Sequence, residues 1–134
     1  MRYLTYDGES LPYGDESFDL AFAICVLHHV AQHERDRFAS ELRRVVRPGG
    51  LVAVFEHNPF NPLTRLAVDR CVFDADAVLV RASGVRRLLK NAGLRPVERR
   101  YVILLPSDRS RVRALERAVV GLPLAAQYYV AARR

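Results

Sequence analysis

Residues that can do chemistry gather in two short stretches of the chain. Cys25 lies near the end of one apolar run that stops at His28 and His29, and Glu56 and His57 follow a second one. Thiols, imidazoles and carboxylates serve as nucleophiles, general bases or metal ligands. Apolar runs of this length without strict alternation predict strands that are buried on both faces, as in a parallel α/β sheet. Because binding groups collect at the carboxyl ends of such strands, the sequence predicts one functional edge.

A metal site is one interpretation of Cys25, His28, His29 and His33. His29 and His33 are one helical turn apart, and His57 could join them from the second strand. The spacing supplies no convincing third ligand on a fixed element. The sequence therefore favours no metal site.

Nucleophilic catalysis by Cys25 with His28 or His29 is another interpretation. A cysteine inside an apolar strand is usually an inert packing residue with a raised pKa. No Gly-rich nucleophile elbow surrounds Cys25. The sequence therefore favours a packing role for this thiol.

The elements that must position these residues form a βαβ unit. The pattern predicts strands over Asp19–Cys25 and Leu51–Phe55, with an amphipathic helix over Gln32–Val46 between them. Pro48-Gly49-Gly50 is expected to end the helix, because proline cannot continue it and glycine accepts a positive φ. The two strands are predicted to be adjacent and parallel, with the helix packed across them.

The remaining chain alternates helix and strand. Ser83 is predicted to cap a helix through Asn91 that ends at Gly93. Further elements are expected as a short strand at Arg2–Tyr6, a helix at Leu63–Arg70, an irregular connection at Phe73–Leu79, a strand at Leu94–Leu105, a helix at Arg109–Val120 capped by Asp108, and a last strand at Gln127–Ala132.

Composition bounds the class of protein. The chain has 134 residues, 50% of them hydrophobic, and a formal net charge of +6. These values predict one globular domain over residues 1–134. Two cysteines outside any CxxC motif, without a signal peptide or a membrane span, favour a cytoplasmic protein.

A nucleic-acid patch could be built from Arg86, Arg87, Lys90, Arg95, Arg99 and Arg100. Because aromatic residues are sparse there, the sequence favours a solvated face, with neither a nucleic-acid nor a membrane partner.

Four motifs in this order resemble a class I S-adenosylmethionine (SAM)-dependent methyltransferase. They are Leu11-Pro12, Ser17-Phe18-Asp19, Leu27-His28-His29-Val30 and the stretch from Leu42 to Gly50. The resemblance implies a Rossmann-like α/β sheet, mostly parallel with an antiparallel last strand. It also implies SAM as the cofactor and methyl transfer as the activity.

The resemblance also assigns roles to individual residues. It implies that Asp7 and Gly8 contact the adenine, although an Asx turn is the alternative for Asp7. The backbone at Cys25 would touch the amino-acid end of the cofactor, and His28 would line the pocket. Glu56 and His57 are the candidates for positioning the methyl acceptor or serving as its base. Tyr128 or Tyr129 either lines the acceptor pocket or packs the last strand.

One part of the family pattern is missing from this sequence. The Gly-rich turn after the first strand is absent, and the chain starts about where the third strand is expected. The chain therefore resembles a truncated domain that lacks the first strands. We expect methyl transfer to a small molecule in a complete fold; the alternative is a non-catalytic remnant that acts as an interaction module or partner subunit. Without its neighbour, the Asp19–Cys25 strand would be an exposed edge, so we expect weak SAM binding and self-association.

Overall fold

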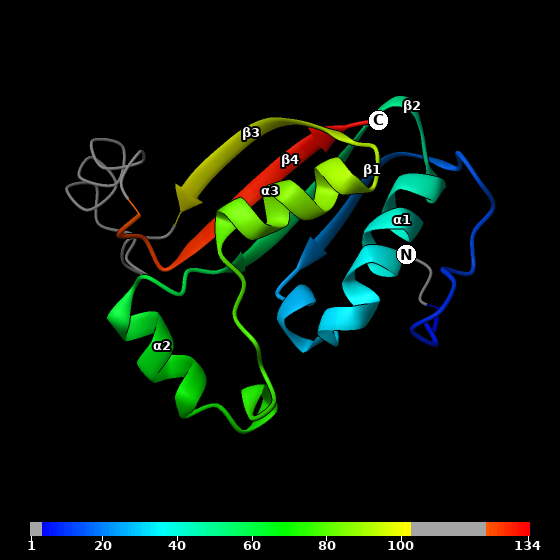
Figure 1. Ribbon diagram of the computed structural model, residues 1–134. Helices are drawn as coiled ribbons and strands as arrows, with labels where there is room; N and C mark the ends of the chain where they lie inside the picture. The colour runs from blue at the N-terminus through cyan, green and yellow to red at the C-terminus, as the bar shows by residue number, and fades with distance from the viewer. Residues whose placement is uncertain (1–3, 103–122) are drawn as a thin grey trace.

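The computed structural model describes residues 4–102 and 123–134, which form an α/β arrangement (Figure 1). The strands are β1 (Phe18–Ile24), β2 (Val46–His57), β3 (Arg95–Val102) and β4 (Gln127–Arg133). The helices are α1 (Arg35–Val45), α2 (Pro62–Asp69) and α3 (Ala82–Asn91), with 3-10 turns η1 (Leu27–His29), η2 (Gln32–Glu34) and η3 (Val72–Asp74). The four-stranded sheet has the order β1-β2-β4-β3.

The predicted βαβ unit is confirmed. β1 and β2 are adjacent and parallel, in a register that pairs Leu20 with Leu51 and Ile24 with Phe55. α1 contacts both strands. The prediction that both strands are buried on both faces is wrong for β1, because Leu20, Phe22 and Ile24 are exposed and Ala23 is its buried residue. The centre of β2 is buried, as the sequence predicts.

The Pro48-Gly49-Gly50 segment lies inside β2, whereas the sequence analysis expected it between helix and strand. α1 ends at Val45 and β2 begins at the next residue. The pairing of β1 with β2 shifts register between Phe18 and Leu20, where the Gly segment loops out of the ladder. A Cβ on Gly50 would lie 2.8 Å from the carbonyl oxygen of Asp19, so only glycine lets the two strands come together here.

The last strand is antiparallel to its neighbours, as the resemblance implies. β4 pairs antiparallel with β2 on one side and with β3 on the other. Three strands of the sheet therefore share one direction and β4 opposes them. This arrangement confirms the predicted fold class.

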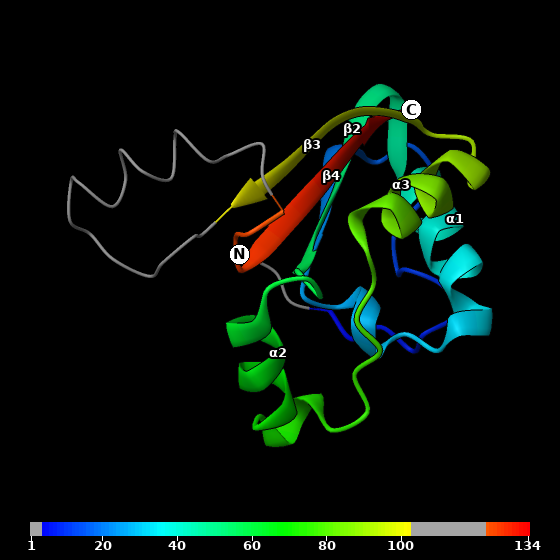
Figure 2. The same cartoon turned by 60° about the vertical axis from the view of Figure 1, so that its left-hand side comes forward.

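α1 and α3 lie side by side on one face of the sheet (Figures 1 and 2). The core lies between them and β2 and β4, with Leu42, Leu89, Val54 and Val130 among its buried residues. α2 lies beyond the carboxyl ends of β1 and β2. The side chains that lie beyond those strand ends therefore come from α2 and from the loops before and after it.

The opposite face of β1 is apolar and exposed in the part of the chain that the structure describes. Leu20, Phe22 and Ile24 are 48%, 60% and 54% exposed. Alternate residues of a strand point to one face, so these three form a continuous stripe. Among the described strands, β1 pairs only with β2 and forms one edge of the sheet.

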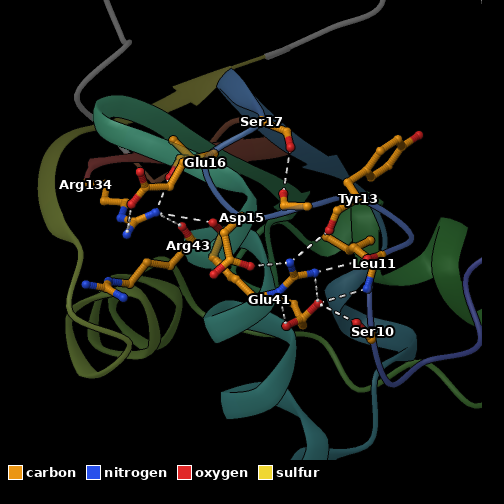
Figure 3. Close-up of polar contacts among 12 residues, drawn as sticks. Ser10, Leu11, Tyr13, Asp15, Glu16, Ser17, Glu41, Arg43 and Arg134 are labelled. Carbon is orange, nitrogen blue, oxygen red and sulfur yellow. Dashed lines mark hydrogen bonds and ion pairs between the residues drawn. The ribbon is translucent and has the colours of Figure 1, made fainter.

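The segment before β1 is a loop held by α1. The expected Arg2–Tyr6 strand is wrong for Leu4–Tyr6, which have no strand structure; the residues before them lie outside the described part. A strand requires a neighbour for its backbone groups, and none of the described strands pairs there. Instead, Arg44 binds Glu41 and Asp15 at 2.8 Å and donates to the carbonyl oxygens of Leu11 and Tyr13 (Figure 3).

Arg134 makes a second group of contacts, at the end of α1. The Arg134 guanidinium donates to the carbonyl oxygens of Arg43, Arg44 and Val46, and it pairs with Glu16 at 2.8 Å (Figure 3). These carbonyls lie at the end of α1, where helical partners run out and the helix dipole favours a cation. Arg134, which directly follows β4, thereby fixes the end of α1.

The helix boundaries differ in part from those expected. Gln32–Glu34 forms a 3-10 turn, so α1 starts at Arg35. Ser83 does not cap α3, because Arg81 occupies the N-cap position and makes no side-chain capping bond. The end of the predicted strand Leu94–Leu105 and the predicted helix Arg109–Val120 with Asp108 lie outside the described residues. No described helix is both long and apolar enough to cross a bilayer.

Candidate functional site

Both chemistry-bearing stretches meet at the carboxyl ends of β1 and β2, as the sequence predicts. Cys25 follows β1 directly, and its amide donates to the carbonyl oxygen of Phe55 at 2.9 Å. Cys25 has φ of 52°, a left-handed conformation that costs a non-glycine residue about 1–3 kcal/mol. Non-glycine residues in this region cluster at functional sites, so this backbone marks the strand end as a candidate site.

Glu56 lies at the centre of the site and is fully buried. Its Oε1 accepts from the amide of Leu27 at 2.8 Å, and its Oε2 lies 2.6 Å from Nδ1 of His28. Both carboxylate oxygens are therefore used inside the protein. Glu56 orients His28 and holds the first turn after β1 in place.

His28 is buried between acidic groups, whereas His57 is not paired in this way. The hydrogen bond that Nδ1 of His28 donates to the Glu56 carboxylate raises the pKa of His28. Burial, and then the neighbouring His28, lowers the pKa of His57, whose ring centroid lies 5.2 Å from that of His28. His57 is therefore the ring that stays neutral and able to accept a proton at neutral pH.

Asp74 is a site residue that the sequence analysis missed. It lies in η3, and its Oδ1 is 3.5 Å from Nε2 of His28 and 3.3 Å from Nε2 of His29. The segment is held over η1 because the Val78 amide donates to the carbonyl oxygen of His28 at 2.9 Å. Nothing in the composition of Phe73–Leu79 predicts that Asp74 lies beside the two histidines. The chain brings Asp74 there because the segment after α2 folds back over η1.

The thiol of Cys25 is poorly suited to nucleophilic catalysis. Burial raises its pKa to about 11, and the negative charges of Glu56 and Asp74 add to the effect. The thiol therefore stays protonated at neutral pH, and Gln127 donates to its sulfur at 3.5 Å. This environment supports the packing role that the sequence favours.

Asp7 and Gly8 lie in the loop that packs on α1, and Asp7 forms the Asx turn considered as an alternative. Its Oδ1 accepts from the amides of Glu9 and Ser10 at 2.8 and 3.1 Å. These bonds lower the pKa of the exposed carboxyl group. Gly8 has φ of 89°, which glycine adopts without strain. An Asx turn leaves the carboxylate exposed, so an adenine contact stays a prediction.

The loop after β2 is irregular and polar, as predicted, and it directs α2 away from the sheet. Asn58 is buried and donates to the carbonyl oxygens of Pro123 and Ala125 at 2.9 and 2.7 Å. Asn61 caps α2 by accepting from the Thr64 amide at 3.0 Å. These two asparagines thereby fix the loop after β2 and the start of α2.

Tyr128 and Tyr129 point to opposite faces of β4. Tyr128 is fully buried and donates to the carbonyl oxygen of Val80 at 2.6 Å, which makes it a packing residue. Tyr129 packs against Phe55, with ring centroids 5.1 Å apart. Tyr129 is on the face that carries the apolar stripe of β1, because it pairs with Phe55 and Phe55 pairs with Ile24.

Comparisons with known proteins agree with this geometry. Residues 1–54 match the family model for a methyltransferase domain. The chain is 44% identical over 55 residues to a tRNA (carboxymethyluridine(34)-5-O)-methyltransferase of Arabidopsis thaliana, covering 40% of this chain and 14% of that protein. It is 34% identical over 76 residues to a ubiquinone/menaquinone biosynthesis C-methyltransferase of Hahella chejuensis, covering 56% and 30%.

A solved structure extends the likeness over nearly the whole chain. A SAM-dependent methyltransferase of Thermotoga maritima, a possible histamine N-methyltransferase, superposes with a TM-score of 0.71 at 20% identity, covering 97% of this chain and 62% of that one. The chain thus spans less than two thirds of that structure and at most 30% of the two curated relatives. Matching motifs, strand order and superposition together identify the fold of this chain as that of the class I SAM-dependent methyltransferases.

Proposed function

We propose that the chain takes part in SAM-dependent methyl transfer to a small-molecule acceptor, in a complete form of the fold. The observation that carries the proposal is the meeting of Cys25, His28, Glu56 and His57 at the carboxyl ends of β1 and β2. Ligands of open α/β sheets bind at that edge. The names of the relatives support the same reaction class.

Residues of this edge and of the loop before β1 are proposed to contact the cofactor. Asp7 presents an exposed carboxylate that can accept a hydrogen bond from an amine, and Gly8 allows close backbone approach. The left-handed backbone at Cys25 and the nearby His28 would border the amino-acid end. When bound, SAM supplies an electrophilic methyl group, and the chain has to align an acceptor with it.

His57 and Glu56 take different parts in this proposal. His57 is half-buried at the end of β2, and its lowered pKa favours the neutral ring that accepts a proton from an acceptor. Glu56 is fully buried with both oxygens bonded, so it acts through His28 as a positioning residue. Asp74 joins them as an acid facing both histidines.

The acceptor is proposed to be a small molecule with an apolar part. Phe60, Leu63 and Leu66, on and before α2, are 53%, 67% and 45% exposed beyond the strand ends. Exposed apolar groups of this kind gather at binding surfaces. The name of the Hahella relative refers to quinone biosynthesis and that of the Arabidopsis relative to tRNA, so transfer to tRNA is the competing outcome.

Calorimetry with S-adenosylhomocysteine tests the cofactor assignment in the longest form that the natural gene encodes. We expect Asp7→Ala to weaken binding several-fold, because one neutral hydrogen bond contributes about 0.5–1.5 kcal/mol. Glu9→Ala is the matched control, since Glu9 is an exposed acid of the same loop. Unchanged affinity in Asp7→Ala would reject the adenine contact.

Methyl-transfer assays test the acceptor and the base. With tritiated SAM, the same protein should label apolar small molecules rather than tRNA. His57→Ala should lower kcat by about 10²–10⁴-fold if His57 removes a proton from the acceptor. If the label appeared only in tRNA, the small-molecule acceptor would be wrong and the acceptor would be a polymer.

The second candidate is an interaction module, and the exposed stripe of β1 favours it. Leu20, Phe22 and Ile24 lie on an edge strand, where unpaired backbone groups accept another strand. A second copy, or a subunit that supplies further strands, would cover both the edge and the stripe. Self-association without cofactor binding by the chain would support this candidate.

A further inference from the structure

Three side chains from two distant segments converge beside the carboxyl end of β1. One ring nitrogen each of His28 and His29 and a carboxylate oxygen of Asp74 lie within 4.8 Å of one another. The histidines lie on η1 and the acid on η3. We propose that His28, His29 and Asp74 bind a divalent transition metal such as zinc.

The two donor distances that involve Asp74 fit a tetrahedral site. Bonds of about 2.0–2.1 Å to a tetrahedral zinc ion place neighbouring ligands about 3.3 Å apart. Oδ1 of Asp74 lies 3.3 Å from Nε2 of His29 and 3.5 Å from Nε2 of His28. Two imidazoles with one carboxylate form a ligand set for such metals.

Glu56 provides the support that metal-binding histidines usually have. Its Oε2 lies 2.6 Å from Nδ1 of His28, so a neutral His28 carries its proton on Nδ1 and its lone pair on Nε2. This lone pair then faces the carboxylate of Asp74, and a metal cation can bind to both acceptors, which lie 3.5 Å apart. A carboxylate that holds a histidine in this tautomer is the common second partner of a metal ligand.

The surroundings hold the ligands in place and leave one side open. Arg35 donates to the carbonyl oxygens of Val30 and Val78, which ties η1 to the segment after η3. The His28 side chain is 1% exposed, whereas that of His29 is 41% exposed. Three protein ligands with one open position are the arrangement of a catalytic metal site.

Metal titration of the full chain tests this proposal, independently of methyl transfer. We expect one zinc ion per chain by calorimetry, and visible absorption typical of a tetrahedral site when cobalt replaces zinc. His29→Ala and Asp74→Asn should each weaken binding by about tenfold or more, and Glu56→Gln by about 10–100-fold.

Matched variants separate this site from adventitious binding. His33→Ala and Asp76→Asn change exposed residues of the same types nearby, and they should leave the affinity unchanged. Circular dichroism of each variant checks that it is folded. Absence of stoichiometric binding, or equal loss in the control variants, would overturn the proposal and leave His28 as an imidazolium held between two carboxylates.

Discussion

Glu56 combines a structural and a site role at the scale of one residue. Its two oxygens bind the Leu27 amide and the His28 ring, and all three groups are buried. A buried charge is tolerated when its hydrogen bonds are complete. The first turn after β1 and the orientation of His28 therefore depend on this one carboxylate.

We expect Glu56→Ala to lower the free energy of unfolding by about 3–5 kcal/mol, because it leaves His28 buried without its partner. Glu56→Gln keeps the shape and should cost less. Urea unfolding followed by circular dichroism measures both variants. Glu98→Ala removes a carboxylate from an exposed pair with Arg100 and should change stability little. Equal losses at the two positions would contradict the central role of Glu56.

The Glu41 carboxyl predicts a defined pH dependence. The hydrogen bonds from Arg44 hold its pKa at about 2, below the ordinary 4.5. A lowered pKa stabilises the fold above pH 4.5, and this contribution disappears as the pH falls toward 2. The difference in urea midpoint between the natural chain and Glu41→Gln should therefore be full at pH 6 and shrink below pH 4.5. A difference that stays constant over this range would contradict the assignment.

At the scale of an element, β2 depends on one glycine. The site requires β1 and β2 to end side by side, and Gly50 lies where their pairing shifts register. Side chains at that position would meet the Val46 side chain at 2.5 Å as well as the Asp19 carbonyl. Gly50 therefore allows β1 and β2 to approach each other closely, in addition to its place in the segment that loops out of the ladder.

Gly50→Ala should lower the free energy of unfolding by about 1–3 kcal/mol, the usual cost of overpacking. Gly14→Ala is the matched control, because a Cβ there meets only Ser17 at an ordinary 3.5 Å. Thermal and urea unfolding of the two variants provide the comparison. Equal stability of the two would mean that β1 shifts away from Gly50 without cost.

At the scale of the whole molecule, one face of the sheet is covered by α1 and α3, and the β1 side of the other face is exposed. The described chain therefore presents an edge and an apolar stripe together. Burial of apolar surface contributes about 25 cal/mol per Å², so pairing at this edge is favourable. Self-association is the expected result.

Leu20→Lys should convert the expected dimer or larger species into a monomer. A charge on the stripe opposes burial of the edge against a second copy. Leu66→Lys is the matched control, because Leu66 is 45% exposed on α2 and Leu20 is 48% exposed on β1. Light scattering at micromolar concentration measures both. A natural chain that is monomeric, or an equal effect of Leu66→Lys, would contradict association through β1.

The sequence by itself determined the βαβ unit, the existence of two later strands and the edge that carries Cys25, His28, Glu56 and His57. These features follow from local patterns, namely continuous apolar runs, helical periodicity and polar residues that end a strand. The antiparallel direction of β4 came from the family resemblance, because periodicity is the same in either direction.

Only the tertiary structure decided which side chains meet at that edge. Asp74 reaches His28 and His29 because the segment after α2 returns over η1, a long-range arrangement that no local pattern encodes. Burial of Glu56, and thus its role through His28, depends on contacts with Leu27 and His28 and on its pairing with Tyr128 of β4, all of them distant in the sequence. Leu4–Tyr6 remained a loop because a strand exists only with a neighbour, and the partner of a strand is set by the whole fold.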